Sequence, residues 1–211
     1  MNLRKKLLRE SRLYVIVDKK TSGRRPMLCI VSKANGSGVD IIQLRDKESK
    51  KEYILKEAYR LKKLLTNTGI LFIVNDYIDI AKLVDSDGIH LGQGDLPITA
   101  ARQLLGSGKI IGKSCHSLNQ AVKAEKEGAD YISIGPVYAT VTKPEYKAVG
   151  LSLIKKVRKA IRIPFFVIGG INKENIRDIL PLGIKRIAVC RAVCRAKNIM
   201  FTIKKFSKIL H

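Results

Sequence analysis

Eight short apolar runs alternate with longer amphipathic segments along this chain. The runs are rich in β-branched residues, which favours strands, and they occupy residues 13–17, 39–44, 70–74, 88–91, 110–112, 131–134, 165–168 and 186–189. Strands that are apolar throughout and separated by helices form a parallel sheet covered on its faces by helices. Eight such units predict an α/β fold, a single closed (β/α)8 TIM barrel. An open doubly wound sheet is the structural alternative.

The segments between the runs carry helix start and stop signals. They predict helices at residues 26–34, 50–65, 78–84, 98–105, 118–127, 151–160, 173–182 and 192–210. Residues 1–12 add a short basic segment with Leu3, Leu7 and Leu8 at near-helical spacing, which predicts a capping helix rather than a targeting peptide. A chain of 211 residues suffices for one large core and is short for two. We therefore expect residues 1–211 to form one domain.

The charge balance is strongly basic, with 41 lysines and arginines against 18 acidic residues and a net charge of +23. Such a field attracts phosphates, nucleic acids or anionic surfaces. The basic residues are spread along the chain without interleaved aromatics, so nucleic-acid binding is not expected as the main function. The charge thus indicates anionic partners without choosing among them.

Features of secreted and membrane proteins are missing from the sequence. No apolar run approaches the roughly 18 to 20 residues that span a bilayer, and no signal-peptide core follows the basic start. The four cysteines form no CxxC pair and no zinc-type spacing, and we expect reduced thiols at Cys29, Cys115, Cys190 and Cys194. We expect a cytoplasmic protein without a membrane partner.

The second predicted strand ends in a cationic cluster, Gln-Leu-Arg-Asp-Lys at residues 43–47. Because strand side chains alternate between faces, Gln43 and Arg45 point the same way and Lys47 lies just beyond. An arginine fork and a lysine ammonium suit a multiply charged anion such as a diphosphate. A solvated strand end is the alternative, which matching chemistry at other strand ends would disfavour.

Two carboxylates follow the next strands, Asp76 after the third and Asp95 after the fourth. In a barrel the carboxyl ends of strands gather at the catalytic face, so these side chains are expected to meet. Mg²⁺ takes one or two carboxylates together with substrate phosphates and waters. Each aspartate alone is equally well explained as a helix cap. Beside Arg45 and Lys47 the pair predicts a metal–diphosphate site.

Histidines and hydroxyls occur at the fourth and fifth strands. Ser114 can donate to a phosphate oxygen. His116 can act as an acid or base near neutral pH, although a single histidine at a strand end is more often structural. His90 lies within an apolar strand and is expected to face the interior in an orienting or packing role.

The last strands are followed by a second set of anion-binding features. A long loop after the sixth strand contains Thr140, Thr142 and Lys143, which suits a flexible lid over an anion. Glycines at 169–170 and the Cys190–Arg191 pair follow strands seven and eight, where barrels often bind phosphate through backbone amides. The sequence thus predicts a metal-bound diphosphate near strands two to five and a monophosphate near strands seven and eight.

Several of these motifs, in this order, resemble the thiamine phosphate synthase family, transferases that join the pyrimidine and thiazole halves of vitamin B1. The matching blocks are QLRDK at 43–47, VND at 74–76, HLGQGD at 90–95, IGPV at 134–137 and TVTKP at 140–144. The resemblance extends over nearly the whole chain. It implies that diphosphate leaves a pyrimidine substrate and that the thiazole nitrogen captures the resulting cation, with Mg²⁺ as cofactor.

The resemblance also implies roles for individual residues. The magnesium ligands would be Asp76 and Asp95, and the groups acting on the leaving diphosphate would be Arg45, Lys47 and Lys143. The diphosphate and pyrimidine contacts would come from Gln43, Arg45, Lys47, Asn75, Ser114 and Lys143. The thiazole phosphate would contact Thr140, Thr142, the Gly170 amide and the backbone at Cys190 and Arg191. Replacing Arg45 or Lys47 is then expected to harm turnover more than folding.

The chain departs from the family pattern at Arg191, where serine is usual, and at Ala139, where proline often stands. Two other functions stay open. One is a thiazole tautomerase of the same barrel family, in which His116 would move a proton, and the other is a non-catalytic phosphate or nucleic-acid binder. Because Arg45, Lys47, Asp76 and Asp95 are all present, the sequence favours the transferase. Family members are often dimers, so a homodimer is also implied.

Overall fold

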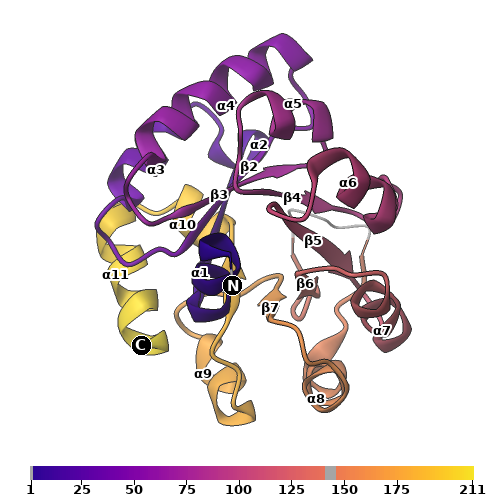
Figure 1. Ribbon diagram of the computed structural model, residues 1–211. Coiled ribbons are helices and arrows are strands. Elements are labelled where there is room, and N and C mark those ends of the chain that lie inside the picture. Colours follow the sequence, from indigo (N-terminus) through magenta and orange to yellow (C-terminus); the bar gives the residue numbers. More distant parts are fainter. Residues whose placement is uncertain (1, 141–145) are drawn as a thin grey trace.

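A computed structural model describes residues 2–140 and 146–211 of the chain. Its eight parallel strands close into a barrel in sequential order, so the open-sheet alternative is wrong and the predicted barrel is confirmed (Figure 1). The strands are β1 Leu13–Asp18, β2 Ile41–Arg45, β3 Leu71–Asn75, β4 Gly88–Leu91, β5 Ile110–Cys115, β6 Tyr131–Ile134, β7 Phe165–Ile168 and β8 Ile187–Val189. The barrel closes through β1 and β8, where Tyr14 pairs with Ala188.

Helices surround this barrel on the outside (Figure 1). The longer ones are α1 Leu3–Glu10, α3 Met27–Ala34, α4 Lys51–Leu65, α5 Ile78–Leu83, α6 Ile98–Leu105, α7 Leu118–Lys126, α8 Gly150–Ala160 and α11 Ile199–Leu210. The short ones are α2 Lys19–Ser22, α9 Ile176–Ile179, the 3₁₀ helix η1 Leu180–Leu182 and α10 Arg191–Cys194. The predicted short N-terminal helix is therefore present as α1.

Several predicted boundaries were wrong for identifiable reasons. The segment 192–210, expected as one helix, is divided into α10 and α11 because the Asn198 side chain caps the backbone N–H of Phe201 at 3.0 Å. The short α2 was missed, and Asp18 begins it by accepting a 2.7 Å hydrogen bond from the Thr21 N–H. Strand β5 runs to Cys115 rather than to residue 112, which places Ser114 inside the strand.

The apolar side chains form two separate cores. The larger lies between the strands and the surrounding helices, and it includes most of the fully buried aliphatic residues. The smaller fills the barrel interior around Tyr14, Tyr131 and Phe166. Leu8 of α1 belongs to this interior core, and in Figure 1 the helix lies across the barrel opening. Helix α1 thus closes the amino-terminal end of the barrel and leaves the carboxyl ends of the strands for a site.

Loops at the amino-terminal end are held by buried or half-buried carboxylates. Asp40 accepts hydrogen bonds from the backbone N–H groups of Arg12 and Leu13, both at 2.8 Å. Asp87 accepts from the Phe72 N–H and pairs with Arg4 of α1, with both contacts at 2.9 Å.

Within the described residues, no helix combines the length and apolar character that crossing a bilayer requires. The cysteines Cys29, Cys115, Cys190 and Cys194 are all free thiols, as predicted.

Candidate active site

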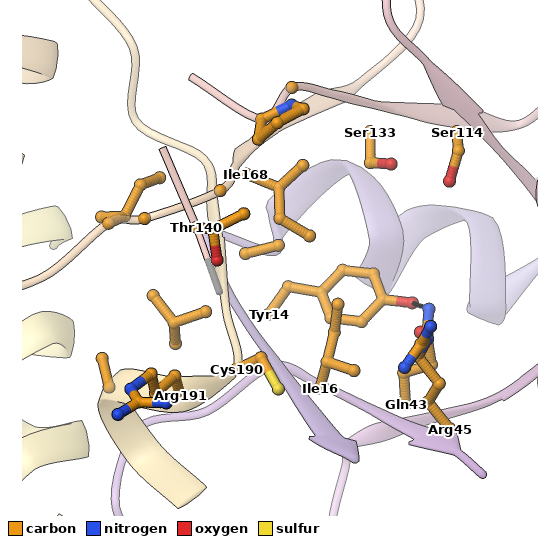
Figure 2. A pocket seen from close by; sticks show the side chains of 18 of the residues that line it. Tyr14, Ile16, Gln43, Arg45, Ser114, Ser133, Thr140, Ile168, Cys190 and Arg191 are labelled. Atoms are coloured by element: carbon orange, nitrogen blue, oxygen red, sulfur yellow. Dashed lines mark hydrogen bonds between the residues drawn. The ribbon is translucent and has the colours of Figure 1, made fainter. Parts of the chain in front are cut away.

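A cavity of about 560 Å³ opens at the carboxyl ends of the strands. This volume lies within the usual range of small-molecule sites, and the position is the one where barrel enzymes bind substrates. Figure 2 shows Gln43 and Arg45 at one end of the cavity and Arg191 at the other. The predicted site residues that line it are Gln43, Arg45, Asn75, Ser114, Thr140, Gly170, Cys190 and Arg191.

Arg45, the last residue of β2, forms an ion pair with Asp18, the last residue of β1. The two residues are neighbours because β1 and β2 pair in register with Asp18 opposite Arg45. Asp18 is buried and Arg45 only slightly exposed, so the pair is poorly screened by water. Because Asp18 binds one end of the guanidinium, the planar fork of Arg45 is held in place beside the cavity.

Beside this end of the cavity, Lys47 Nζ lies 2.9 Å from Asp76 Oδ2. A hydrogen bond joins the carboxyl groups of Asp76 and Asp95, so the two predicted carboxylates do meet. Burial and the bond to Asp95 raise the pKa of Asp76. Burial acts the same way on Asp95, but the bonds from Asp76 and from the Gly92 N–H, together with nearby lysine charges, lower the pKa of that carboxyl. The carboxyl groups of Asp76 and Asp95 thus interact directly with one another beside the Lys47 ammonium.

The backbone of Asp76 is unusual, with a φ of 62°. This left-handed conformation is tolerated by Asp and Asn far better than by other non-glycine residues. The turn is fixed by the Asp76 N–H, which donates to the carbonyl of His90 at 2.9 Å. The conformation directs the chain sharply away from β3 and places the carboxylate next to Asp95.

The residues present fit a magnesium ion. Asp76 and Asp95 supply two hard oxygen donors, which suffice where substrate phosphates and waters complete the coordination. Among the described residues no group of three or more His, Cys, Asp or Glu side chains could hold a metal ion. The donor set thus suits an ion that arrives with a phosphorylated substrate, rather than one held in a complete protein cage.

A chain of hydrogen bonds crosses the barrel interior beneath the cavity. The amide Nε2 of Gln43 donates to the Tyr14 hydroxyl at 2.7 Å, and this hydroxyl lies 2.9 Å from that of Tyr131. The Tyr131 hydroxyl lies 2.9 Å from His90 Nδ1, and His90 Nε2 lies 2.9 Å from Ser114 Oγ. These residues come from β2, β1, β6, β4 and β5, so two predicted substrate contacts are joined through three buried rings.

The interior location of these hydrogen-bonded residues accounts for their acid–base properties. Burial raises the pKa of both Tyr14 and Tyr131 well above the usual tyrosine range, so both hydroxyls stay protonated. His90 is buried and faces the interior as predicted, and both of its ring nitrogens have partners. Tyr14 and Tyr131 were not recognised from sequence, because a strand that is apolar on both faces does not reveal which face points inward.

At the other end of the cavity the lining includes two consecutive glycines. Gly169 and Gly170 follow β7 with φ values of 102° and 66°. A Cβ on Gly170 would lie 2.8 Å from the carbonyl oxygen of Ala139, so only glycine fits there. Arg191, the first residue of α10, is exposed and lines the same end, as does Arg195 one turn later. Arg195 was not recognised from sequence.

His116 also lines the cavity. Its Nδ1 donates to the carbonyl of Gly135, and its ring stacks on Tyr146 at a centroid distance of 4.3 Å. These contacts fix the ring orientation. The remaining predicted contacts, Thr142 and Lys143, lie outside the described residues, as does the middle of the predicted lid.

The fold and the cavity define the class of protein: a (β/α)8 barrel with a cavity of small-molecule size at the carboxyl ends of its strands. The family model described as thiamine monophosphate synthase matches residues 13–193. The chain belongs to this family.

Individual relatives agree with this membership. The thiamine-phosphate synthase of Shouchella clausii is 44% identical over 189 residues, which cover 89% of this chain and 90% of the relative. That of Halalkalibacterium halodurans is 42% identical over 204 residues, covering 96% and 97%. Among solved structures, a thiamine phosphate pyrophosphorylase from Pyrococcus furiosus superposes with a TM-score of 0.87 at 36% identity, covering 99% of this chain and 98% of that one.

Proposed function

We infer that this protein catalyses the thiamine-phosphate synthase reaction, a transfer that releases diphosphate. The substrates are 4-amino-2-methyl-5-hydroxymethylpyrimidine diphosphate and thiazole phosphate. The bond between the pyrimidine methylene carbon and the diphosphate oxygen breaks, and its electron pair leaves with the diphosphate. The thiazole nitrogen then forms the new carbon–nitrogen bond. The observation that carries the proposal is a cluster next to the end of the cavity that Arg45 and Asn75 line: Lys47 pairs there with Asp76, whose carboxyl group contacts that of Asp95.

The leaving diphosphate would lie at this end. Arg45 can direct the N–H groups not used by Asp18 toward its oxygens. Lys47 is half exposed and can exchange its contact with Asp76 for one with the diphosphate. Asp76 and Asp95 would hold Mg²⁺, which when bound neutralises charge on the diphosphate oxygens. These groups stabilise charge that develops as the bond breaks, and such stabilisation is usually the largest contribution to catalysis.

The pyrimidine ring would contact the wall formed by Gln43, Asn75 and Ser114. Gln43 donates one amide hydrogen to Tyr14 and keeps its carbonyl oxygen available to a ring amino group. The hydroxyl of Ser114 lies 2.9 Å from His90 Nε2, and this hydrogen bond holds the serine side chain in place. Because neither residue has to reorient when the ring binds, the interior chain would place the reactive methylene carbon in a fixed position.

The thiazole phosphate would lie against Gly170, Thr140 and the start of α10, with Cys190 nearby. Arg191 replaces the usual serine here, and its guanidinium is exposed at the cavity edge, where it can add a charge-assisted contact to the phosphate. Binding the thiazole by its phosphate brings the ring nitrogen against the methylene carbon. No protein nucleophile is needed. Thr142 and Lys143 remain proposed contacts.

The test is formation of thiamine phosphate by the parent protein and by Asp76→Asn. Asparagine tolerates the left-handed backbone of Asp76, so this variant removes the charge without straining the turn. We expect Mg²⁺-dependent product in the parent and a loss of about 100-fold in the variant. Asp79→Asn is the matched control, because it removes an exposed carboxylate three residues away that pairs with Lys51 at 2.9 Å. Full activity without metal, or in Asp76→Asn, would contradict the proposed site.

The tautomerase alternative is tested with the same preparation. If the protein isomerised the thiazole carboxylate phosphate and His116→Ala abolished this turnover, the alternative would gain support. The predicted homodimer and cytoplasmic location remain predictions, which gel filtration and localisation of a tagged protein would test.

A further inference from the structure

A second cavity, of about 780 Å³, lies at the amino-terminal end of the barrel. It is formed by α1, by residues 129–130 before β6, by the end of α8 with residues 161–165, and by residues 183–186 before β8. It therefore lies at the opposite end from the candidate active site, which is built on the carboxyl ends of the strands. Neither the motifs nor the proposed reaction explain it.

The lining of this second cavity is strongly basic. One carboxylate, Asp130, faces six basic side chains, which are Lys5, Arg9, Arg158, Arg162, Lys185 and Arg186. Asp130 is already engaged, because it pairs with Lys5 at 2.9 Å and with Arg102, and accepts the Ile111 N–H at 2.9 Å. In the part of the chain that the structure describes, the other five cavity cations form no ion pair with a carboxylate. Most of the positive charge in the cavity is therefore uncompensated.

Arg186 gives a second, independent indication of a missing acceptor. Its Nη2 donates to the carbonyl of Arg9 at 2.6 Å, while its Nε is buried without any hydrogen-bond partner. Burial and the neighbouring Arg12 lower the pKa of this guanidinium. A buried donor of a charged group is costly to leave unpaired, and such groups in native structures call for an explanation such as a bound ion or ligand.

The local backbone leaves room for the cationic groups. Gly183 has a φ of 71°, and a Cβ there would lie 2.7 Å from Nη2 of Arg158. The absence of a side chain at Gly183 lets the guanidinium of Arg158 lie over the turn before β8. Arg158 lies in the last turn of α8 and Arg162 just beyond the end of this helix, and both exposed side chains line the cavity.

The cavity also has an apolar wall, to which the partly buried Ile163, Pro164 and Phe165 contribute. Arginine forks bind phosphate oxygens in pairs, and a flat aromatic or aliphatic surface suits a ring. A bare anion would leave the wall uncovered. A nucleic-acid strand fits less well, because the charge surrounds a concavity and stacking rings are sparse.

We propose that this amino-terminal cavity binds a small organic polyphosphate of the nucleoside di- or triphosphate class. The phosphates contact Arg158, Arg162 and Arg186, and the ring lies against the wall at Phe165. The charge is excessive for a monophosphate but appropriate for two or three phosphate groups. This site is separate from the active site and does not depend on the proposed reaction.

The experiment is calorimetric titration of the full-length protein with ATP at about 150 mM salt, compared with the double variant Arg158→Gln/Arg162→Gln. Loss of two charged contacts is expected to weaken ATP binding by about tenfold or more. Lys204→Gln/Lys208→Gln is the matched control, because it removes the same charge from exposed positions on α11, outside the cavity. Transferase activity is measured on all preparations and should be unchanged, since neither pair belongs to the active site.

Each outcome bears on the proposal. Selective loss of ATP affinity in Arg158→Gln/Arg162→Gln, with weaker binding of inorganic triphosphate than of ATP in the parent, supports it. Absence of ATP binding in the parent overturns it, as does equal weakening in both double variants, which would indicate a non-specific charge effect. Unchanged affinity in the cavity variant would place ATP elsewhere, for example in the active site. Tighter cavity-dependent binding of a single-stranded oligonucleotide would replace the proposed ligand with nucleic acid.

Discussion

The hydroxyl oxygens of Tyr14 and Tyr131 lie 2.9 Å apart inside the closed barrel, where both rings are almost completely buried. The pair connects β1 with β6 across the interior. It is also the middle of the chain of hydrogen bonds that begins at Gln43 and ends at Ser114. A polar connection in an otherwise apolar interior is expected to fix the positions of the side chains at both of its ends.

Removal of the Tyr131 hydroxyl should therefore lower the stability of the fold. In Tyr131→Phe, Tyr14 and His90 Nδ1 each lose a buried partner, so we expect the free energy of unfolding to fall by about 1–3 kcal/mol. Denaturant unfolding followed by circular dichroism measures this change. The control Tyr138→Phe removes a hydroxyl near the surface that contacts Asp178 at 3.3 Å, and should change stability by less than about 0.5 kcal/mol. Equal stabilities of the two variants would contradict a structural role for the interior chain.

Arg45 and Lys47 should differ in their effect on folding, although both are proposed to act on the diphosphate. Arg45→Gln leaves the carboxylate of Asp18 buried and unpaired, which typically costs about 3–5 kcal/mol. Lys47 is half exposed, so Lys47→Gln should change stability by less than about 0.5 kcal/mol. The sequence predicts that replacing either residue harms turnover more than folding. The structure modifies this expectation for Arg45, whose replacement should lower both the turnover rate and the stability of the fold.

Two measurements separate these effects. Thermal or denaturant unfolding gives stability, and initial rates of thiamine phosphate formation give activity under conditions where the variant is folded. We expect a loss of about 100-fold in both variants, as for removal of a group that stabilises developing charge. Arg45→Lys keeps the charge and should recover part of the stability. If Arg45→Gln were as stable as Lys47→Gln, the contact with Asp18 would contribute nothing measurable.

Gly112 on β5 is required by the ring of Tyr131 on the neighbouring strand. A Cβ at Gly112 would lie 2.1 Å from the ring, and Gly112 pairs directly with Tyr131 in the sheet. Gly112→Ala should therefore displace the ring and lower the free energy of unfolding by about 1–3 kcal/mol. Gly94→Ala is the control, since no heavy atom lies within 4 Å of a Cβ there. A ring shift should appear in the near-ultraviolet circular dichroism of Gly112→Ala alone.

The sequence predicts the barrel because eight apolar runs alternate with helical segments, and no side-chain detail is needed for that inference. It also indicates which strand ends carry polar groups, so Gln43, Arg45, Asn75 and Ser114 were correctly expected to converge. Contacts across the interior could not be predicted, because they depend on which face of each strand points inward and on the shear of the closed sheet. For this reason the connection from Gln43 to Tyr14 emerges only from the structure.

Helix α1 should contribute to stability through one of its leucines and not through another. Leu8 is 2% exposed and packs against the interior core, whereas Leu3 on the same helix is 68% exposed. Leu8→Ala removes buried methyl groups and leaves a cavity at the amino-terminal end of the barrel, so the free energy of unfolding should fall by about 2–5 kcal/mol. Leu3→Ala has the same chemistry at an exposed position and should cost less than about 0.5 kcal/mol. Urea unfolding of both variants measures the difference, and equal midpoints would show that α1 does not close the barrel in solution.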